Sequence, residues 1–310
     1  MKILCVGQLV ADVLVRPVGP IDFHVDTVCV DRIEVSNGGD CMNVAVGLAR
    51  LGCQVQFVGK VGEDDFGRLL RARLDSVGID HSGLLIDHTA PTSSTIVLIN
   101  EAGDRVFLHC PGANQSLCAQ DAREECIADC GLVFVGGTFL LPRMDGDGTA
   151  ALFQRAKQHG AITAMDVTHD PSHRWMEVIR PCLAHLDYFL PSIAEAEKIT
   201  GRTDPETIAD VLLGQGVGTA VIKLGNKGCY VKNRSEQFYH AAYPTQTIDT
   251  TGAGDSFVAG FLTGLSLGRP LKECAGMGCA VGSVCVGHFG ATTEALTKDV
   301  LEALMRSKIE

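Results

Sequence analysis

The stretch Asp249-Thr-Thr-Gly-Ala-Gly-Asp-Ser-Phe257 leads from a glycine turn into the apolar segment 257–265, which is predicted to be a helix. The first backbone amides of a helix lack partners and carry partial positive charge, so a helix start is a ready anion site. The glycines let the main chain approach a ligand without a Cβ in the way. Asp255 is then a base beside an amide cradle, the arrangement that phosphoryl transfer to an alcohol requires. A plain Asp cap on a helix is the structural alternative.

A second glycine-rich stretch, Asn37-Gly-Gly-Asp-Cys-Met-Asn-Val-Ala-Val-Gly-Leu-Ala-Arg-Leu-Gly52, lies far upstream of the first. In this order the two stretches resemble the N- and C-terminal signatures of the ribokinase-like (PfkB) carbohydrate kinases. Shorter matches at 111–114, 190–197 and 223–228 fill the interval, so the resemblance covers essentially the whole chain. It implies a ribokinase-like α/β fold and an ATP-dependent kinase.

Composition bounds the class of protein. The chain has 310 residues, of which 46% are hydrophobic and 20% charged, enough for one large domain or two small ones. A net charge of −11 disfavours binding to nucleic acid or to an anionic membrane, so phosphates must be held by local dipoles and a few cations. No segment reaches membrane-spanning length, and the apolar run at the N-terminus is too short for a signal peptide. The 13 scattered cysteines predict reduced thiols and a cytoplasmic protein.

Short apolar runs alternate with helical patterns along most of the chain, which predicts a doubly wound, mainly parallel sheet with helices on both faces. The predicted strands are 3–6, 55–58, 133–135, 162–167, 188–190 and 220–222. The predicted helices are 42–51, 64–77, 149–159, 174–183, 194–200, 207–213, 255–267, 271–286 and 297–305. Residues 228–243 are typical of an antiparallel hairpin at one edge of the sheet.

Two strand-like segments, 13–37 and 92–110, do not fit this alternation. A small sheet needs partners, so we expect them to pair with each other as a lid over the main sheet. The predicted division is a core of 1–11, 38–90 and 112–310 and a small β lid of 12–37 and 91–111. The resemblance implies that the lid covers the sugar and forms a homodimer contact. The alternative is that both segments extend the main sheet.

The resemblance assigns the chemistry and the acceptor site. It makes Asp255 the general base and the amides of Gly252, Ala253 and Gly254 an anion hole. It assigns the sugar substrate to four positions, Asp12, Gly38, Gly39 and Asn43. Asp12 follows the first strand, where ligands collect in α/β sheets, and a carboxylate can accept hydrogen bonds from two adjacent hydroxyls. Asp40 is counted with these substrate-binding residues, although it stands where relatives vary, so it either tunes specificity or is solvated. Without the resemblance these are a turn Asp, a turn glycine pair and a helix-start Asn.

The nucleotide side follows from the same resemblance. Ser192 and Glu195 match the family's Asn-x-x-Glu motif with Ser in place of Asn. The resemblance implies that Glu195 organises Mg²⁺ through water. Lys223 would meet the phosphates of ATP as a point charge, or else lie in water at a strand edge. Gly225 and Gly228 would shape the turn under the nucleotide. The resemblance assigns Asp249 and Thr251, with the loop near Gly290, to a monovalent-cation site, such as one for K⁺. Gly278 stands where several relatives carry an Asn that faces the adenine.

A histidine pair and two further carboxylates lie outside the motifs described so far. His169 and His173 have i,i+4 spacing, but Pro171 between them makes a shared helix face and a zinc site a remote prospect. Asp166 and Asp170 follow a predicted strand and are expected to be cleft or loop carboxylates of unassigned role. No P-loop and no Gly-x-Gly-x-x-Gly after the first strand are present, which argues against a P-loop kinase and a dinucleotide oxidoreductase.

The sequence therefore predicts an ATP-dependent kinase that phosphorylates a hydroxyl of a free sugar or related polyol. A same-fold kinase acting on a nucleoside is one alternative, disfavoured by an aromatic content of 5%. A phosphorylated sugar is another, with Arg16, Arg32 or Arg105 on the lid as its phosphate partners. A non-catalytic sugar-binding regulator is the alternative from a different class.

Overall fold

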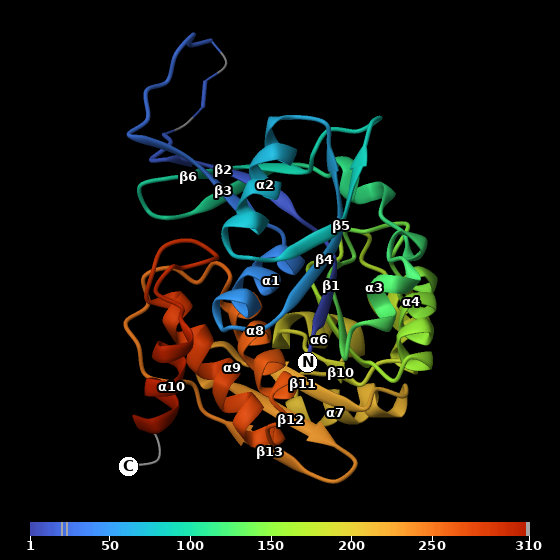
Figure 1. Cartoon of the computed structure of the whole chain (residues 1–310). Coiled ribbons are helices and arrows are strands. Elements are labelled where there is room, and N and C mark those ends of the chain that lie inside the picture. The colour runs from blue at the N-terminus through green and yellow to red at the C-terminus, as the bar shows by residue number, and fades with distance from the viewer. Residues whose placement is uncertain (20, 23, 308–310) are drawn as a thin grey trace.

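The structure is a computed structural model that describes residues 1–307 except 20 and 23 (Figure 1). Its centre is a nine-stranded sheet in the order β13-β12-β11-β10-β9-β8-β1-β4-β5. All neighbours pair in parallel except β12 and β13, which form the antiparallel edge that the sequence predicted. The strands are β1 (Ile3–Gly7), β4 (Val55–Gly62), β5 (Asp80–Asp87), β8 (Leu132–Thr138), β9 (Ile162–Val167), β10 (Tyr188–Phe189), β11 (Thr219–Lys223), β12 (Cys229–Asn233) and β13 (Gln237–His240).

Helices cover both faces of this sheet, because successive strand residues point to opposite sides. In β1, Ile3 and Cys5 join one hydrophobic core cluster, while Leu4 and Val6 join the other. The first cluster packs against α1 (Asp40–Arg50), α2 (Asp65–Ser76), α8 (Ala253–Ser266), α9 (Leu271–Val286) and α10 (Lys298–Ser307). The second packs against α3 (Glu124–Ala128), α4 (Asp147–Gln158), α5 (Met176–Leu183), α6 (Ile193–Thr200) and α7 (Pro205–Gly214). The predicted doubly wound fold is confirmed.

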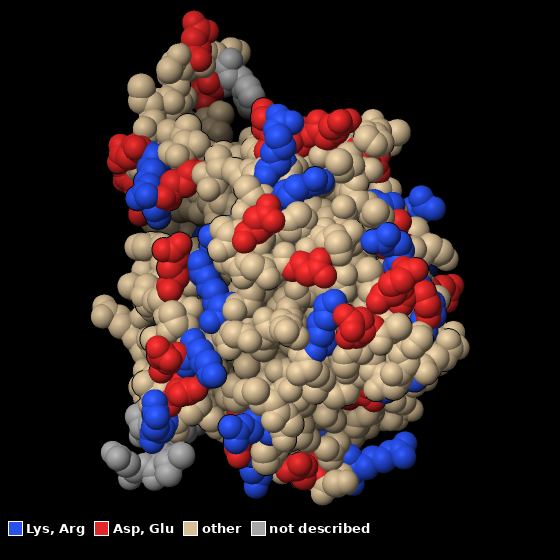
Figure 2. All heavy atoms as spheres, in the orientation of Figure 1, with Lys and Arg blue, Asp and Glu red and all other residues tan. Residues whose placement is uncertain are grey.

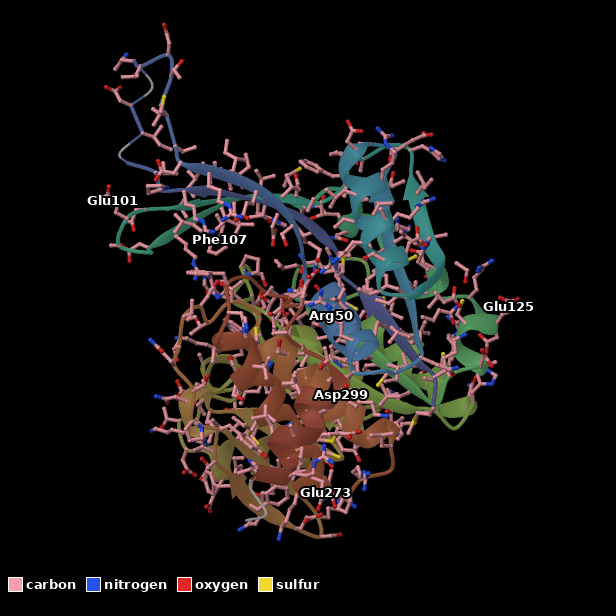
Figure 3. All side chains as sticks on the ribbon, turned by 60° about the vertical axis from the view of Figure 1, so that its left-hand side comes forward. Arg50, Glu101, Phe107, Glu125, Glu273 and Asp299 are labelled. Carbon is pink, nitrogen blue, oxygen red and sulfur yellow. The ribbon has the colours of Figure 1, made fainter. Side chains whose placement is uncertain are left out.

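A separate four-stranded sheet, here called the lid sheet, has the order β3-β2-β6-β7. It consists of β2 (Val10–Arg16), β3 (Arg32–Gly38), β6 (Ser94–Ile99) and β7 (Arg105–Cys110). The two odd segments thus pair with each other, through parallel strands β2 and β6, and the alternative that they extend the main sheet is wrong. Figure 3 shows the lid sheet, with Glu101 and Phe107 labelled, extending above the C-terminal helices.

The two faces of the lid sheet differ in polarity. Asp12, Thr95 and His109 are paired neighbours across β2, β6 and β7, so they share one face, here called the inner face. Arg105 lies on the same face by the two-residue period of β7. The other, outer face is aliphatic and consists of Val13, Val15, Ile33, Val35, Ile96, Leu98, Val106 and Leu108.

One of the four chain connections between the lid sheet and the core leads from β1 into β2. Only Gln8 and Leu9 separate β1 from β2, and both are buried. The Asn114 side chain holds Leu9 through both of its backbone groups, donating to the carbonyl at 2.9 Å and accepting from the amide at 3.5 Å. The 111–114 motif therefore clamps the connection between the two sheets.

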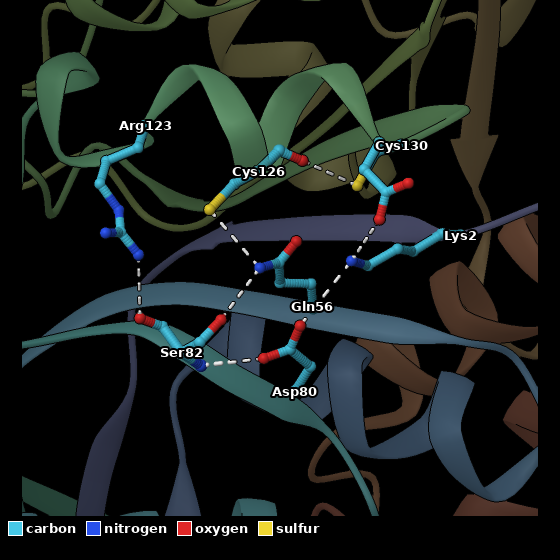
Figure 4. Close-up of polar contacts among 8 residues, drawn as sticks. Lys2, Gln56, Asp80, Ser82, Arg123, Cys126 and Cys130 are labelled. Carbon is cyan, nitrogen blue, oxygen red and sulfur yellow. Dashed lines mark hydrogen bonds and ion pairs between the residues drawn. The ribbon is translucent and has the colours of Figure 1, made fainter.

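Strand β5 was missed by the sequence analysis because its start is polar. Ser82 accepts a hydrogen bond from Gln56 Nε2 at 3.2 Å, and its amide donates to Asp80 at 3.0 Å (Figure 4). These bonds join polar side chains at the start of β5, where apolar alternation is absent. Cys126 and Cys130 beside them are buried, as expected for small apolar side chains, and the Cys130 thiol donates to the Cys126 carbonyl at 3.0 Å.

Helices α8 and α9 approach closely, which fixes the position of the α8 start. A Cβ on Gly260 would lie 2.5 Å from the Met277 carbonyl oxygen, and one on Gly264 would lie 2.8 Å from Cys274 Cα. Glycine is thus required where the two helices cross. None of the described helices has the length and apolarity needed to cross a membrane.

Candidate active site

The turn before α8 is built on a left-handed glycine. Gly252 has φ 73°, and a Cβ there would lie 2.5 Å from the Ala291 backbone, so the turn packs against the loop 287–291. The Ala253 amide donates to the Thr250 carbonyl at 3.2 Å. This bond closes the turn and occupies the Ala253 amide. Of the three amides predicted to form the anion hole, Ala253 is therefore not available. Within the described chain, the Gly252 and Gly254 amides have no such bond and can meet an anion.

Asp255 lies in the first turn of α8 and is joined to the upstream glycine motif. Asn43 Nδ2 donates to Asp255 Oδ2 at 2.9 Å, and Asn37 Nδ2 donates to Asn43 Oδ1 at 3.2 Å. Burial raises the pKa of Asp255 above its ordinary value, and nearby Glu195 raises it further, while the Asn43 bond and Lys223 oppose the rise. Asn37 was not among the predicted site residues, although it lies in the quoted motif.

Asp12 lies on the inner face of the lid sheet, directly over the glycine pair. A Cβ on Gly38 would lie 1.9 Å from Asp12 Oδ2, so only glycine admits the carboxylate there. Gly39 has φ 87°, and its Cβ would lie 2.9 Å from the Gln8 carbonyl oxygen. The sequence motif thus places Asp12 and Asn43 on either side of one glycine turn. Burial raises the pKa of Asp12 to about 6, against a hydrogen bond with Thr95 that lowers it.

A cavity of about 620 Å³ opens beside Asp255. Nine predicted residues line it, namely Asp40, Ser192, Glu195, Lys223, Gly225, Gly228, Ala253, Gly254 and Asp255. Asp12, Gly38, Gly39 and Asn43 are not among its lining residues, so the acceptor and nucleotide assignments fall on two sides of Asp255. Asp40 was assigned to the acceptor side, but it lines the cavity instead.

Lys223 is the cation of this cavity, and its side chain is only 11% exposed. It forms a short hydrogen bond with Asp166, whose side chain is 4% exposed, so the alternative of an edge lysine in water is wrong. The ammonium also lies 3.4 Å from where a Gly254 Cβ would be. Burial would lower the pKa of Lys223, but Asp166, Glu195 and Asp255 raise it, so the ammonium stays charged.

Negative charge exceeds positive charge around Lys223. Burial raises the pKa of Asp166 to about 7, with Lys223 opposing and Glu195 reinforcing the shift. Burial also raises the pKa of Asp40 well above its ordinary value, and Asp255 and Asp166 add to the rise. One ammonium therefore faces four carboxylates, an arrangement that would be relieved by a cation. Figure 2 shows acidic and basic side chains interspersed on the displayed face. The attraction for a cation therefore comes from the carboxylates of the site itself and not from this surface.

Ser192 and Glu195 begin α6 as a reciprocal capping box. The Ser192 amide donates to Glu195 Oε2 at 2.7 Å, and the Glu195 amide donates to Ser192 Oγ at 3.4 Å. Substitution of Ser for Asn in the motif thus keeps the cap. The Glu195 carboxylate accepts from the Ser192 amide while the residue lines the cavity. This helix-capping role was not predicted from the sequence.

The Asp249 carboxylate is enclosed by four donors. Its Oδ1 accepts from the Thr251 amide at 2.9 Å, the Thr251 hydroxyl at 2.7 Å and Arg105 Nη2 at 2.7 Å. Its Oδ2 accepts from the Gly290 amide at 3.0 Å. Burial would raise the pKa of Asp249, but these bonds outweigh it and lower the pKa to about 2. Asp249, Thr251 and Gly290 lie together, as expected. Arg105 lies on the lid, also as expected, but its contact with Asp249 was not predicted.

The glycines on the nucleotide side have distinct roles. Gly225 has φ 60° and begins a short 3₁₀ turn, Gly225–Lys227. Gly228 has φ 93°, and its Cβ would lie 1.9 Å from the His240 carbonyl oxygen. Gly278 packs against the Phe257 ring, whereas Cys279, Gly282 and Ser283 of the same helix line the cavity.

The donor set of the cavity fits Mg²⁺, which prefers carboxylate oxygens and retains several waters. Asp40, Asp166 and Glu195 all line the cavity. Within the described residues, no three acidic, His or Cys side chains are arranged to hold a metal by themselves. A bound Mg²⁺ would therefore need water and phosphate oxygens to complete its shell.

The remaining motifs lie outside this chemistry. His169 and His173 have ring centroids 5.7 Å apart, and the described residues offer no third ligand for zinc. Asp170 is a loop carboxylate that accepts from the Ser172 and Trp175 amides at 2.8 and 2.6 Å. Asp166, left without a role by the sequence analysis, is the partner of Lys223. Lys223 ends β11 and Asp166 lies in β9, with β10 between them, so no local sequence pattern indicates this pair.

Comparisons with known proteins match this architecture. The family model of pfkB family carbohydrate kinases matches residues 1–298. A fructokinase-1 of Zea mays is 31% identical over 73% of this chain and 72% of its own length. An Arabidopsis thaliana ribokinase solved with ribose and ATP has a TM-score of 0.88 at 24% identity, over 98% of both chains. A putative ribokinase II of E. coli, solved with ATP and Mg²⁺, has a TM-score of 0.86 at 22% identity, over 99% of both chains.

Replacing Lys223 with Met is expected to destabilise the protein by about 3 kcal/mol, because the buried carboxylates lose their cation. The loss should be larger near pH 8 than near pH 5. The folded-state pKa of Asp166 is already raised, and it rises further without Lys223, so acid protonates the folded state and relieves the repulsion. Urea unfolding at both pH values measures this.

Lys232→Met is the matched control, because Lys232 pairs with Asp210, whose side chain is 61% exposed. Its effect should be small at both pH values. An equal loss for Lys223→Met at the two pH values would contradict the charge imbalance.

Proposed function

Because this chain belongs to the pfkB family of carbohydrate kinases, we propose that it phosphorylates a hydroxyl of a small, unphosphorylated sugar or related polyol. Family membership makes it an ATP-dependent phosphotransferase with a carbohydrate hydroxyl as acceptor, as the two motifs predicted. The observation that carries the finer proposal is the bond from Asn43 to Asp255, which sets the acceptor motif against the base at 2.9 Å.

The acceptor is proposed to lie between the lid sheet and the glycine pair. Asp12 and Asn43 would hold its hydroxyls, with Gly38 and Gly39 allowing close approach. Thr95 and His109 extend the polar inner face, since Thr95 Oγ1 and His109 Nδ1 are 2.9 Å apart. We further propose that residues 12–37 and 91–111 act as a lid unit over this space.

The chemistry is assigned to the start of α8. ATP with Mg²⁺ supplies the transferable phosphoryl group and part of the charge neutralisation. Asp255 takes the proton of the acceptor hydroxyl, which its place beside Asn43 allows. The amides of Gly252 and Gly254 hold negative charge on the transferred group, and Lys223 adds a fixed positive charge on the same side. Because the transition state is loose, positioning matters more than basicity.

The nucleotide is proposed to occupy the 620 Å³ cavity, above the turn of Gly225 and Gly228. Mg²⁺ would be held by Glu195 through water, with Asp40 and Asp166 as further oxygen donors. The K⁺ site on Asp249 and Thr251 stays a prediction. The Asp249 carboxylate already carries Arg105, so K⁺ would depend on backbone oxygens of the two loops.

The alternative acceptors are less well supported. A phosphorylated sugar needs free cations on the lid, yet Arg16 and Arg32 both pair with Glu34. Arg105 is engaged by Asp249 and Thr251. The proposed cytoplasmic location is supported by the thirteen cysteines, whose spacing is not that of a disulfide framework.

A panel of free pentoses, hexoses, sugar acids and polyols, followed by ADP release, tests the function. We expect Asp255→Asn to lower kcat on the best acceptor by about 10²–10⁴-fold, the usual effect of losing a general base. Asp210→Asn is the control variant, because it makes the same change at an exposed carboxylate on α7, outside the site, and should leave kcat unchanged. A folded wild-type protein that releases no ADP with any acceptor would favour the sugar-binding regulator.

The acceptor KM should depend on the ionisation of Asp12. Its pKa is raised to about 6, so the carboxylate becomes protonated below that pH and loses an acceptor for sugar hydroxyls. We expect KM to rise by up to about tenfold per pH unit below 6. Asp12→Asn should give a high KM with a flat profile, and a pH-dependent KM in this variant would remove Asp12 from the acceptor site.

A homodimer through the outer face of the lid sheet is proposed. Ile33, Val106 and Leu108 are 63%, 59% and 54% exposed, and a contiguous aliphatic face of this kind marks an interface. Leu108→Asp should shift the protein from dimer to monomer in light scattering. Leu267→Asp changes a similarly exposed leucine, 59%, directly after the end of α8 and should leave the mass unchanged. A wild-type monomer at micromolar concentration would contradict this interface.

A further inference from the structure

Two arginines of the lid sheet reach the same part of the core. Arg105 of β7 donates from Nη2 to Asp249 Oδ1 at 2.7 Å and from Nη1 to the Thr251 hydroxyl. The guanidinium carbon of Arg16 in β2 lies 5.2 Å from the centre of the Phe289 ring. Asp249 and Phe289 belong to the two segments that flank the turn before α8. The lid sheet is therefore in contact with both sides of that turn.

The contacts continue from these segments into the turn itself. Asp249 accepts from the Gly290 amide at 3.0 Å, which ties the two segments together. Ala291, the next residue, packs so closely on Gly252 that a Cβ there would lie 2.5 Å away. The Cys285 thiol adds a bond to the Thr251 carbonyl at 3.3 Å. The position of the Gly252 amide thus depends on the neighbours that Asp249 holds.

The ion pair of Arg105 differs from an ordinary surface pair. Its two side chains are 31% and 11% exposed, and the guanidinium makes two directed bonds instead of one. A two-pronged arginine contact fixes orientation as well as charge. The contact joins the lid sheet to Asp249 and to the neighbouring Thr251 hydroxyl at the same time.

We propose that Arg105 is a positioning residue that couples closure of the lid sheet to assembly of the anion hole. This rests on the proposed function, since the acceptor is what the lid sheet covers. With the sheet in place, Arg105 holds Asp249, and Asp249 with Gly290 fixes the turn that presents the Gly252 and Gly254 amides. With the sheet lifted, Asp249 loses its only side-chain cation within the described residues. The Gly252 and Gly254 amides are then positioned for the transition state only when the lid sheet covers the acceptor.

The kinetic test compares Arg105→Gln with Arg105→Lys on the best acceptor. Arg105→Gln should lower kcat by roughly tenfold or more, because misplacement of the amides is felt in the transition state. The KM values for ATP and acceptor should change by less than about threefold, as expected when ground-state binding is kept. Arg105→Lys should recover part of kcat, since it keeps the charge without the two-pronged geometry.

The pathway through Asp249 is tested by a double-mutant cycle. Arg105→Gln combined with Asp249→Asn should have a kcat within about threefold of the weaker single variant, because both changes break one chain of contacts. Effects that multiply would overturn the proposal. So would an Arg105→Gln variant whose acceptor KM rises while kcat stays unchanged, since that describes a lid contact without coupling.

Hydrogen exchange gives a readout that needs no turnover. In the protein without substrates, Arg105→Gln should speed exchange of the amides in 249–254 relative to wild type. Arg234→Gln, which removes an exposed charge in the turn between β12 and β13, should not. Unchanged exchange in Arg105→Gln would overturn the coupling even if the protein phosphorylates sugars. Faster exchange in a protein that phosphorylates none would retain the coupling and remove the function.

Discussion

The bond between Asn43 Nδ2 and Asp255 Oδ2 joins the two glycine motifs, which are 212 residues apart in the chain. It can form only because α1 and α8 lie side by side on one face of the central sheet, where Gly47 faces Ala259 with no room for a Cβ. The close crossing of α8 and α9 fixes the other side of the same helix. The glycines of these helices therefore serve the site indirectly, by setting how near the helices come.

Around that bond the protein concentrates charge of one sign. Burial raises the pKa values of Asp40, Asp166 and Asp255, neighbouring carboxylates reinforce the rise, and the single Lys223 ammonium only partly opposes it. A fold stabilised only by its own contacts would gain by replacing such a cluster with apolar side chains. The arrangement makes physical sense when the cavity receives cations and the phosphates that accompany them. The repulsion among the carboxylates then destabilises the protein only while the cavity is empty.

Much of the fold could be predicted from the sequence, because alternating apolar runs and glycine motifs depend on local rules. The separate lid sheet, the antiparallel edge and the α9 boundaries follow those rules. Strand β5 does not, since its start is stabilised by side-chain bonds from Gln56. Glycine turns were predictable where the backbone needs a positive φ, as at Gly39 and Gly252, while the roles of the site residues stay predictions. Partners from distant segments, such as Asp166 for Lys223 or Arg105 for Asp249, carry no local pattern and needed coordinates.

The two-residue connection at Gln8 and Leu9 has a mechanical consequence. A sheet that pivots near this point behaves as a lever, and displacement grows with distance from the pivot. Asp12 is close to the fulcrum and would keep its place over Gly38 through a small rotation. Arg105, on a strand two positions across the sheet from β2, would travel farther for the same rotation. Asn114 bonds both backbone groups of Leu9 and so stiffens one of the connections about which the sheet would turn.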